Sequence, residues 1–263
     1  MAYLSVGETN DELIEKMLAH GVLDDGSKIL EAFRVTDRGD FVPQTHRLEA
    51  YTDRPFKRDF VHISAPHMYV TVLEHLELQP GMSFLNIGSG SGYFSCLAAC
   101  MLGDGGLSHG IDIDANVVRH SQECCERWFK GVLARREAGE VGLPTISREG
   151  VALVHGAIPI SLAFVFTLTC RTPFSPHPSL TPLALIAAGN CFDIDVAVAV
   201  SSCRYDRIYV GAGCPADKKE FFFSLLSDTG IMVVLTRPLS SPYLISTNLF
   251  LAPICILLQV SNY

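Results

Sequence analysis

The sequence predicts an α/β fold with a doubly wound, mostly parallel sheet. From residue 83 onward, apolar runs typical of buried strands alternate with segments of helical periodicity. The first run, residues 83–87, leads directly into a glycine-rich turn at 88–92. An acid, Asp112, follows the next apolar run. A glycine turn after one strand and an acid after the next are typical of a nucleotide-type cofactor site in such a sheet.

The elements predicted along the chain alternate regularly between helix and strand. A helix is predicted over 8–20 with Thr9 or Asn10 as its cap, a short second helix is centred on 29–33, and a polar loop runs to about residue 60. The remaining predicted elements are helices at 68–76, 93–102, 115–129 and 218–226, strands at 83–87, 107–111, 151–154, 204–212 and 231–235, and a charged loop at 130–150.

The composition narrows the class of protein. With 48% hydrophobic residues among 263, the chain has enough apolar material for one large domain, which excludes general disorder. A formal net charge of −8 argues against nonspecific nucleic-acid binding, because neutralising phosphates requires a basic face. We therefore expect no nucleic-acid partner.

The cysteines and the start of the chain indicate a compartment. Nine cysteines are scattered without any CxxC pair, so we predict no metal site. The first residues are polar and lack the basic and apolar regions of a signal peptide. A reducing, cytoplasmic location is therefore expected.

Two apolar segments do not fit the alternating pattern. Residues 157–189 contain five prolines and one charged residue, and residues 237–263 are similarly apolar and broken by Pro253. Neither gives the run of about 20 apolar residues that a membrane helix needs, so no membrane association is expected. We hypothesise that 157–189 is translated intron sequence or an insertion that loops out of the fold. The tail would replace the strands that normally complete such a sheet and leave an exposed edge.

The glycine turn has the chemistry of a ligand cradle. Glycines allow a tight turn and a close backbone approach to a ligand, and their GxGxG spacing differs from the GxGxxG form of dinucleotide-binding dehydrogenases. The acid that follows can accept hydrogen bonds from ribose hydroxyls. The alternative is that Asp112 caps the helix at 115–129, although Asp114 is better placed for that. The predicted cradle residues are Gly88, Ser89, Gly90, Gly92 and Asp112.

Several motifs occur in the same order as in protein-L-isoaspartate O-methyltransferases, which this chain resembles over about residues 5–156 and 190–236. The resemblance implies a Rossmann-like fold of S-adenosylmethionine-dependent methyltransferases. It further implies a methyltransferase domain at 1–236 with an N-terminal helical cap, followed by an atypical tail at 237–263. The motifs are Ile63-Ser64-Ala65-Pro66-His67-Met68, Gly88-Ser89-Gly90-Ser91-Gly92-Tyr93, Gly110-Ile111-Asp112 and Tyr205-Asp206-Arg207-Ile208-Tyr209-Val210-Gly211-Ala212, together with Thr36-Asp37-Arg38.

The resemblance implies methyl transfer from S-adenosyl-L-methionine to the carboxylate of isoaspartyl residues in damaged proteins or peptides. Ser64 corresponds to the active-site serine, whose hydroxyl would bind the substrate carboxylate; alternatively it caps the helix at 68–76. Ile63 would line the cofactor site. Gly156 and Asn190 would be the two halves of a motif near the adenine, separated by the 157–189 insertion.

Some details resemble a subgroup, the isoaspartate methyltransferase domain-containing proteins. Asn86 stands where the enzymes usually carry an acid, and it keeps an acceptor while losing the charge. Members of this subgroup are thought to act as ubiquitin-ligase adaptors through a C-terminal extension, which we do not expect in this chain. The alternative function is therefore a catalytically weak, cofactor-binding adaptor. A small-molecule methyltransferase is a third interpretation, and the Ser64–His67 motif argues against it.

Overall fold

The computed structural model describes residues 5–146, 151–154, 204–212, 219–236 and 254–259, in which helices flank a central sheet. The helices are α1 (Asn10–Ala19), α2 (Lys28–Val35), the 3-10 helices η1 (Arg38–Phe41) and η2 (Gln44–Tyr51), α3 (Pro66–Leu76), α4 (Tyr93–Leu102), α5 (Ala115–Glu137) and α8 (Lys219–Ser224). The strands are β1 (Phe56–Arg58), β2 (Val61–Ile63), β3 (Ser83–Ile87), β4 (Leu107–Ile111), β5 (Val151–Val154), β6 (Tyr205–Val210), β7 (Leu226–Thr236) and β8 (Ile254–Gln259).

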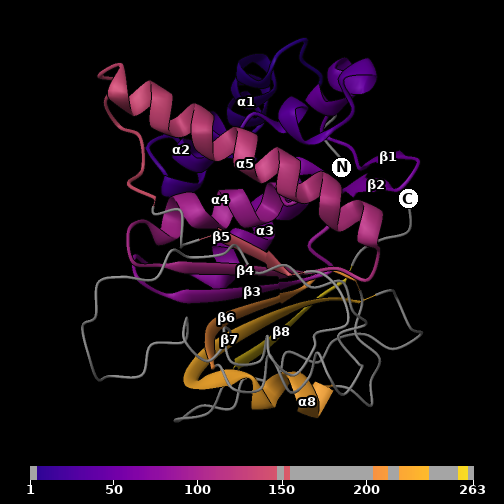
Figure 1. The fold of residues 1–263 in the computed structure, drawn as a ribbon, viewed down its shortest axis with the longest axis vertical. Helices are drawn as coiled ribbons and strands as arrows, with labels where there is room; N and C mark the ends of the chain where they lie inside the picture. Colours follow the sequence, from indigo (N-terminus) through magenta and orange to yellow (C-terminus); the bar gives the residue numbers. More distant parts are fainter. Residues whose placement is uncertain (1–4, 147–150, 155–203, 213–218, 237–253, 260–263) are drawn as a thin grey trace.

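Six strands form one parallel sheet in the order β5-β4-β3-β6-β7-β8. Figure 1 shows α1 to α5 on one side of this sheet and α8 on the other. Helices on both sides follow from right-handed crossovers, since β4 and β5 lie to one side of β3 while β6, β7 and β8 lie to the other. The predicted doubly wound α/β fold is confirmed.

The N-terminal helices pack over the helices that flank the sheet, and α1 buries an apolar stripe on one face. Thr9 accepts a hydrogen bond from Glu12 N at the start of α1, and Leu13, Ile14 and Met17 are almost completely buried at spacings that repeat with the helical turn. The second helix, α2, packs against α4. These contacts place the N-terminal part of the chain over the sheet.

Four predicted elements have the bounds that the sequence indicates, and each is delimited by a local signal. They are β3, α4, β4 and β5. The glycines at 88–92 separate β3 from α4, and the Gly103–Gly106 segment separates α4 from β4. Sharp backbone turns at glycine limit β3, α4 and β4 at these junctions regardless of their tertiary partners.

Other predicted bounds are wrong because tertiary contacts determine where those elements begin and end. The segment predicted as a polar loop contains η1, η2 and β1, and the predicted loop at 130–150 begins with the last turns of α5. This helix continues because Trp128 and Val132 extend its buried stripe. The strand β7 begins at Leu226 and runs through Gly230, five residues earlier than predicted.

The C-terminal tail contributes a strand that the sequence did not predict. Residues 254–259 form β8, which pairs in parallel with β7 from Ile231↔Ile254 to Thr236↔Gln259. The expectation that the tail leaves the sheet without a further strand is therefore wrong at these residues. The segment at 157–189 lies outside the described residues.

Two features of the described residues bear on membranes and metals. None of their helices combines the length and apolar composition needed to cross a bilayer. Within the same residues, no group of three or more His, Cys, Asp or Glu side chains is arranged to hold a metal ion.

A buried polar pair links β4 and β6 inside the sheet. Nδ1 of His109 lies 2.9 Å from Oη of Tyr205, and both side chains are almost fully buried. Burial lowers the pKa of His109 from 6.5 to about 4, because the charged imidazolium loses its hydration. The histidine is therefore neutral in the folded protein at neutral pH.

We expect the His109→Gln variant to lose part of the acid sensitivity of the wild-type protein. Between pH 6.5 and about 4 the unfolded chain binds a proton at His109 that the folded chain does not. The free energy of unfolding therefore falls as the pH drops through this window, by about 2 kcal/mol at pH 4.5. Glutamine keeps a hydrogen-bonding group for Tyr205 but does not titrate. Urea unfolding at pH 7 and 4.5 checks this, and equal losses in the two proteins would contradict it.

Candidate functional site

The carboxyl ends of β3, β4 and β6 meet at one edge of the sheet. The central strand β3 pairs with β4 on one side and with β6 on the other, so the order of the strands reverses beside it. Open α/β sheets bind ligands at such a reversal. The glycine turn follows β3 and Asp112 follows β4, so the structure brings both predicted groups to this edge.

The turn after β3 depends on glycine at three positions. Gly88, Gly90 and Gly92 have φ angles of 77°, 56° and 84°, in the left-handed region that other residues rarely adopt. The amides of Gly88 and Ser89 both donate to the carbonyl oxygen of Ile111, at 2.8 and 2.9 Å. These bonds tie the turn to the end of β4.

Two of these glycines also approach other segments closely, so that a side chain would be crowded at either position. A Cβ on Gly88 would lie 2.6 Å from Cβ of Ala212, just after β6. A Cβ on Gly90 would lie 3.0 Å from the carbonyl oxygen of His62 in β2. The turn is therefore in close backbone contact with the segment that leads into Ser64.

Asp112 belongs to the turn rather than to the cap of α5. Its Oδ2 accepts from the Gly90 amide at 2.8 Å, and its Oδ1 accepts from Asp114 N at 3.2 Å. The cap of α5 is Asp114, which accepts from Asn116 N at 2.7 Å. The alternative role of Asp112 as the helix cap is therefore wrong. A carboxylate offers about four acceptor positions, so lone pairs remain for a ligand beside the turn.

Ser64 lies between β2 and α3 and does not cap the helix. The cap position of α3 is Ala65, without a side-chain hydrogen bond. Asp53 caps the helix instead, because its Oδ1 accepts a hydrogen bond from the amide of His67 at 2.9 Å. The same oxygen lies 2.8 Å from Nδ1 of His67. Ser64 is half-buried, and its amide donates to Oη of Tyr69 at 3.0 Å.

Arg38 is a site-supporting residue whose role sequence reasoning missed. Its guanidinium is completely buried, with Nε donating to the carbonyl of Ala50 at 2.9 Å and Nη2 to those of Arg54 and Ile63 at 3.2 and 3.5 Å. Burial lowers the pKa of Arg38, against the opposing effect of nearby Tyr93. The sequence marks this residue through the Thr36-Asp37-Arg38 motif, at the start of a segment predicted to be a loop. Burial could not be inferred from it.

Asn86 presents an unused acceptor near the end of β3. Its Nδ2 donates to Oγ of Ser95 at 3.0 Å, whereas its buried Oδ1 has no partner among the described residues. The turn amides of Gly88, Ser89 and Gly90 bond elsewhere, so Asn86 does not satisfy them. A buried acceptor without a donor costs about 1–3 kcal/mol, which a bound donor would recover.

Two predicted site residues, Gly156 and Asn190, lie outside the described residues. The structure brings the others together: Ile63 and Ser64 reach the glycine turn through the contact of His62 with Gly90, and Asp112 reaches it by a hydrogen bond. Ile63 is 1% exposed and lies on the inner face of β2.

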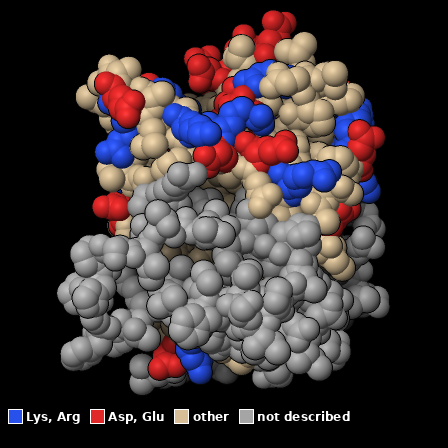
Figure 2. Space-filling view, viewed as in Figure 1, with Lys and Arg blue, Asp and Glu red and all other residues tan. Residues whose placement is uncertain are grey.

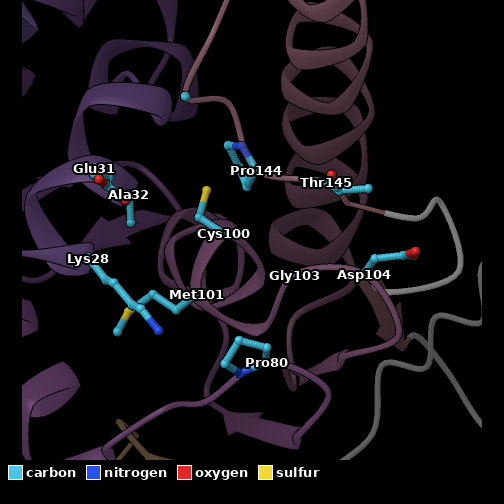
Figure 3. Close-up of a pocket in the computed structure, with 11 residues that line it drawn as sticks. Lys28, Glu31, Ala32, Pro80, Cys100, Met101, Gly103, Asp104, Pro144 and Thr145 are labelled. Carbon is cyan, nitrogen blue, oxygen red and sulfur yellow. The ribbon is translucent and has the colours of Figure 1, made fainter.

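Two hollows lie apart from the glycine turn. One of about 240 Å³ includes Lys28, Cys100, Asp104 and Thr145 in its lining (Figure 3). It lies at the C-terminal end of α4, whereas the glycine turn lies at the N-terminal end. The ten residues of α4 separate the two by about 15 Å. The other, of about 540 Å³, lies between the N-terminal helices and α5. On the face in Figure 2, basic and acidic side chains are interleaved over the described residues.

The chain matches the model of a known protein family over most of the segments that form this site. The model described as Protein-L-isoaspartate(D-aspartate) O-methyltransferase (PCMT) matches residues 8–147, more than half of the chain. The chain belongs to this family. The matched range includes the Ser64 segment, the glycine turn and Asp112, whereas β6 and the rest of the C-terminal part lie beyond it.

Curated members of the PCMT family are similar over part of their length. A protein-L-isoaspartate O-methyltransferase of Triticum aestivum is 41% identical over 123 residues, which are 46% of this chain and 52% of the relative. The corresponding protein of Caenorhabditis elegans is 34% identical over 138 residues, covering 48% and 59%. The chain thus spans about half the length of the curated relatives it matches.

Solved structures show the same fold over a longer range. A Plasmodium falciparum protein described as a beta-aspartate methyltransferase (PCMT), in complex with S-adenosyl-L-homocysteine, superimposes with a TM-score of 0.57 at 20% identity. The superposition covers 87% of this chain and 84% of that one. A further protein-L-isoaspartate O-methyltransferase gives a TM-score of 0.52 at 18% identity, covering 84% and 53%.

We expect Gly88→Ala to destabilise the protein more than Gly81→Ala. Both glycines have positive φ, 77° and 81°, so alanine costs about 1–2 kcal/mol of strain at either position. Space is open around Gly81, whereas a Cβ on Gly88 meets Ala212. Overpacking should add about 1–3 kcal/mol at Gly88. Urea midpoints of the two variants and the wild type check this, and equal destabilisation would show that the contact with Ala212 carries no constraint.

Proposed function

We propose that the chain is an S-adenosyl-L-methionine-dependent protein carboxyl O-methyltransferase that acts on isoaspartyl residues. The observation that carries this proposal is the backbone contact between the Ser64 segment and the glycine turn, at the edge where Asp112 also lies. A carboxylate held at Ser64 would face a ligand held by the turn. Membership of the PCMT family supports the same reaction.

Two observations of the described residues fit the cofactor. The Asp112 carboxylate has acceptor positions for ribose hydroxyls, and the buried Oδ1 of Asn86 suits a donor such as an ammonium group or a water bound to it. The similar Plasmodium falciparum protein was solved with S-adenosyl-L-homocysteine. The cofactor contacts that we propose are Ile63, Gly88, Ser89, Gly90, Gly92 and Asp112, together with Gly156 and Asn190 outside the described residues.

The chain's own residues act mainly by orientation. When bound, S-adenosyl-L-methionine supplies an electrophilic methyl group. An isoaspartyl carboxylate is already ionised at neutral pH and needs no general base, so alignment of the two reactants is the main requirement. The Ser64 hydroxyl donates a hydrogen bond to this carboxylate and orients it, while the apolar side chain of Ile63 helps to exclude water.

The alternative function, a catalytically weak adaptor, has less support. The matched curated relatives are named as methyltransferases. The replacement of an acid by Asn86 removes a charge but keeps the acceptor, whose oxygen has no described partner. Loss of charge weakens a hydrogen bond from about 1.5–3 to about 1 kcal/mol, which is compatible with cofactor binding.

We also propose the extent of the domain, the partners and the location. The methyltransferase domain is taken as residues 1–236, and β8 supports adding 254–259 to its sheet. The partners would be isoaspartyl-containing proteins or peptides. A cytoplasmic location is supported by the free thiols of Cys96, Cys100, Cys124 and Cys125 among the described residues.

Methyl transfer to an isoaspartyl peptide tests the function. We expect the full chain to transfer a labelled methyl group from S-adenosyl-L-methionine to this peptide and not to the same peptide with ordinary aspartate. Ser64→Ala should lower kcat/KM by about 10- to 100-fold, because it removes one hydrogen bond to a charged group. Cofactor affinity should not change. A wild-type chain that binds cofactor but labels neither peptide would favour the adaptor.

Calorimetry with S-adenosyl-L-methionine tests the cofactor site separately. Asp112→Ala should weaken binding by at least about tenfold, since ribose hydroxyls lose a charged acceptor. Asp114→Ala is the matched control, because it also removes a carboxylate that accepts a backbone amide, but one at the start of α5. Its affinity should equal that of the wild type. Equal losses in the two variants would show that Asp112 acts on the fold alone.

A further inference from the structure

The hydroxyl of Tyr69 is engaged with Ser64. Its Oη accepts the Ser64 amide at 3.0 Å. Burial raises the pKa of Tyr69, while the charge of Arg38 and the hydrogen bond from the Ser64 amide partly lower it. The phenol thus contacts the backbone group that orients Ser64.

Tyr69 is itself held rigidly. It is 7% exposed and its ring stacks on Phe94, with centroids 4.8 Å apart and planes 24° from parallel. On the other side of Ser64, the guanidinium of Arg38 donates to the carbonyl of Ile63. The residue that precedes Ser64 and the amide of Ser64 are therefore both fixed by buried side chains.

A fixed backbone sets where the Ser64 hydroxyl can reach. The Ser64 amide donates to Oη of Tyr69, and the preceding Ile63 carbonyl accepts from Arg38, so the Cα–Cβ bond of Ser64 has a set direction. Rotation about this bond between staggered rotamers then carries the hydroxyl toward an incoming group.

We propose that Tyr69 is a positioning residue, which fixes the backbone of Ser64 so that its hydroxyl donates to the substrate carboxylate. The inference rests on the proposed function, because it concerns the substrate group of the same reaction. It adds a residue of α3 to the site, five positions after Ser64. Tyr69 acts through Ser64 and not on the reacting atoms.

The chain offers a matched control for the Tyr69 hydroxyl. The ring of Tyr93 lies 5.8 Å from that of Tyr69, is also buried, and faces the Arg38 guanidinium at 5.5 Å. The Tyr93 hydroxyl has no hydrogen-bond partner among the described residues. Tyr69→Phe and Tyr93→Phe therefore remove the same atom from the same aromatic cluster, and only the first removes a bond to Ser64.

The test measures methyl transfer to the isoaspartyl peptide and cofactor affinity in both variants. Tyr69→Phe should lower kcat/KM for the peptide by about tenfold, with the cofactor Kd unchanged. Tyr93→Phe should match the wild type in both. In the Ser64→Ala background, Tyr69→Phe should have no further effect, because its action passes through Ser64. The Ser64 amide should exchange its hydrogen faster in Tyr69→Phe than in Tyr93→Phe.

Three outcomes would overturn the inference, and they are distinguishable. An active wild type with equal kcat/KM in Tyr69→Phe and Tyr93→Phe would overturn the role of Tyr69 and leave the proposed function intact. If Tyr69→Phe lowered kcat/KM in the Ser64→Ala background as much as in the wild type, Tyr69 would act independently of Ser64. A wild-type chain without methyl transfer would overturn the proposed function and this inference together.

Discussion

The buried guanidinium of Arg38 is the constraint on which the geometry of the site depends. It is a cation without solvent exposure, and it bonds to carbonyl groups of η2, of the following loop and of β2. Its remaining nitrogen, Nη1, has no described partner, and its charge lies over the ring of Tyr93. Desolvating such a charge is costly, so the carbonyls must stay where they compensate for it. The segment that ends at Ile63 is thereby fixed against the helices.

The glycine turn imposes the complementary constraint from the sheet. It approaches β2 at Gly90, where a side chain would be crowded, and the residue after β6 at Gly88, where a side chain has no room. Asp112 then links the turn to the strand β4. Backbone segments from three parts of the chain are held within contact distance, which is the precision that an orientation-based reaction requires.

Buried polar groups have different roles in the molecule. His109 and Tyr205 bond to each other within the sheet and support the fold. The Oδ1 of Asn86 lies near the carboxyl end of β3 and has no partner in the described residues. An unused acceptor near the edge where a ligand is proposed is expected of a binding site.

The sequence by itself determined the elements that local chemistry delimits and the residues that a glycine motif marks. The bounds of β3, α4 and β4, and the meeting of Asp112 with the glycine turn, follow from glycine punctuation and from parallel strands sharing one edge. Tertiary structure alone decided the length of α5, the place of β8 and the roles of Arg38 and Tyr69. Those outcomes depend on burial and on partners distant in sequence, and neither a residue's type nor its neighbours along the chain specify them.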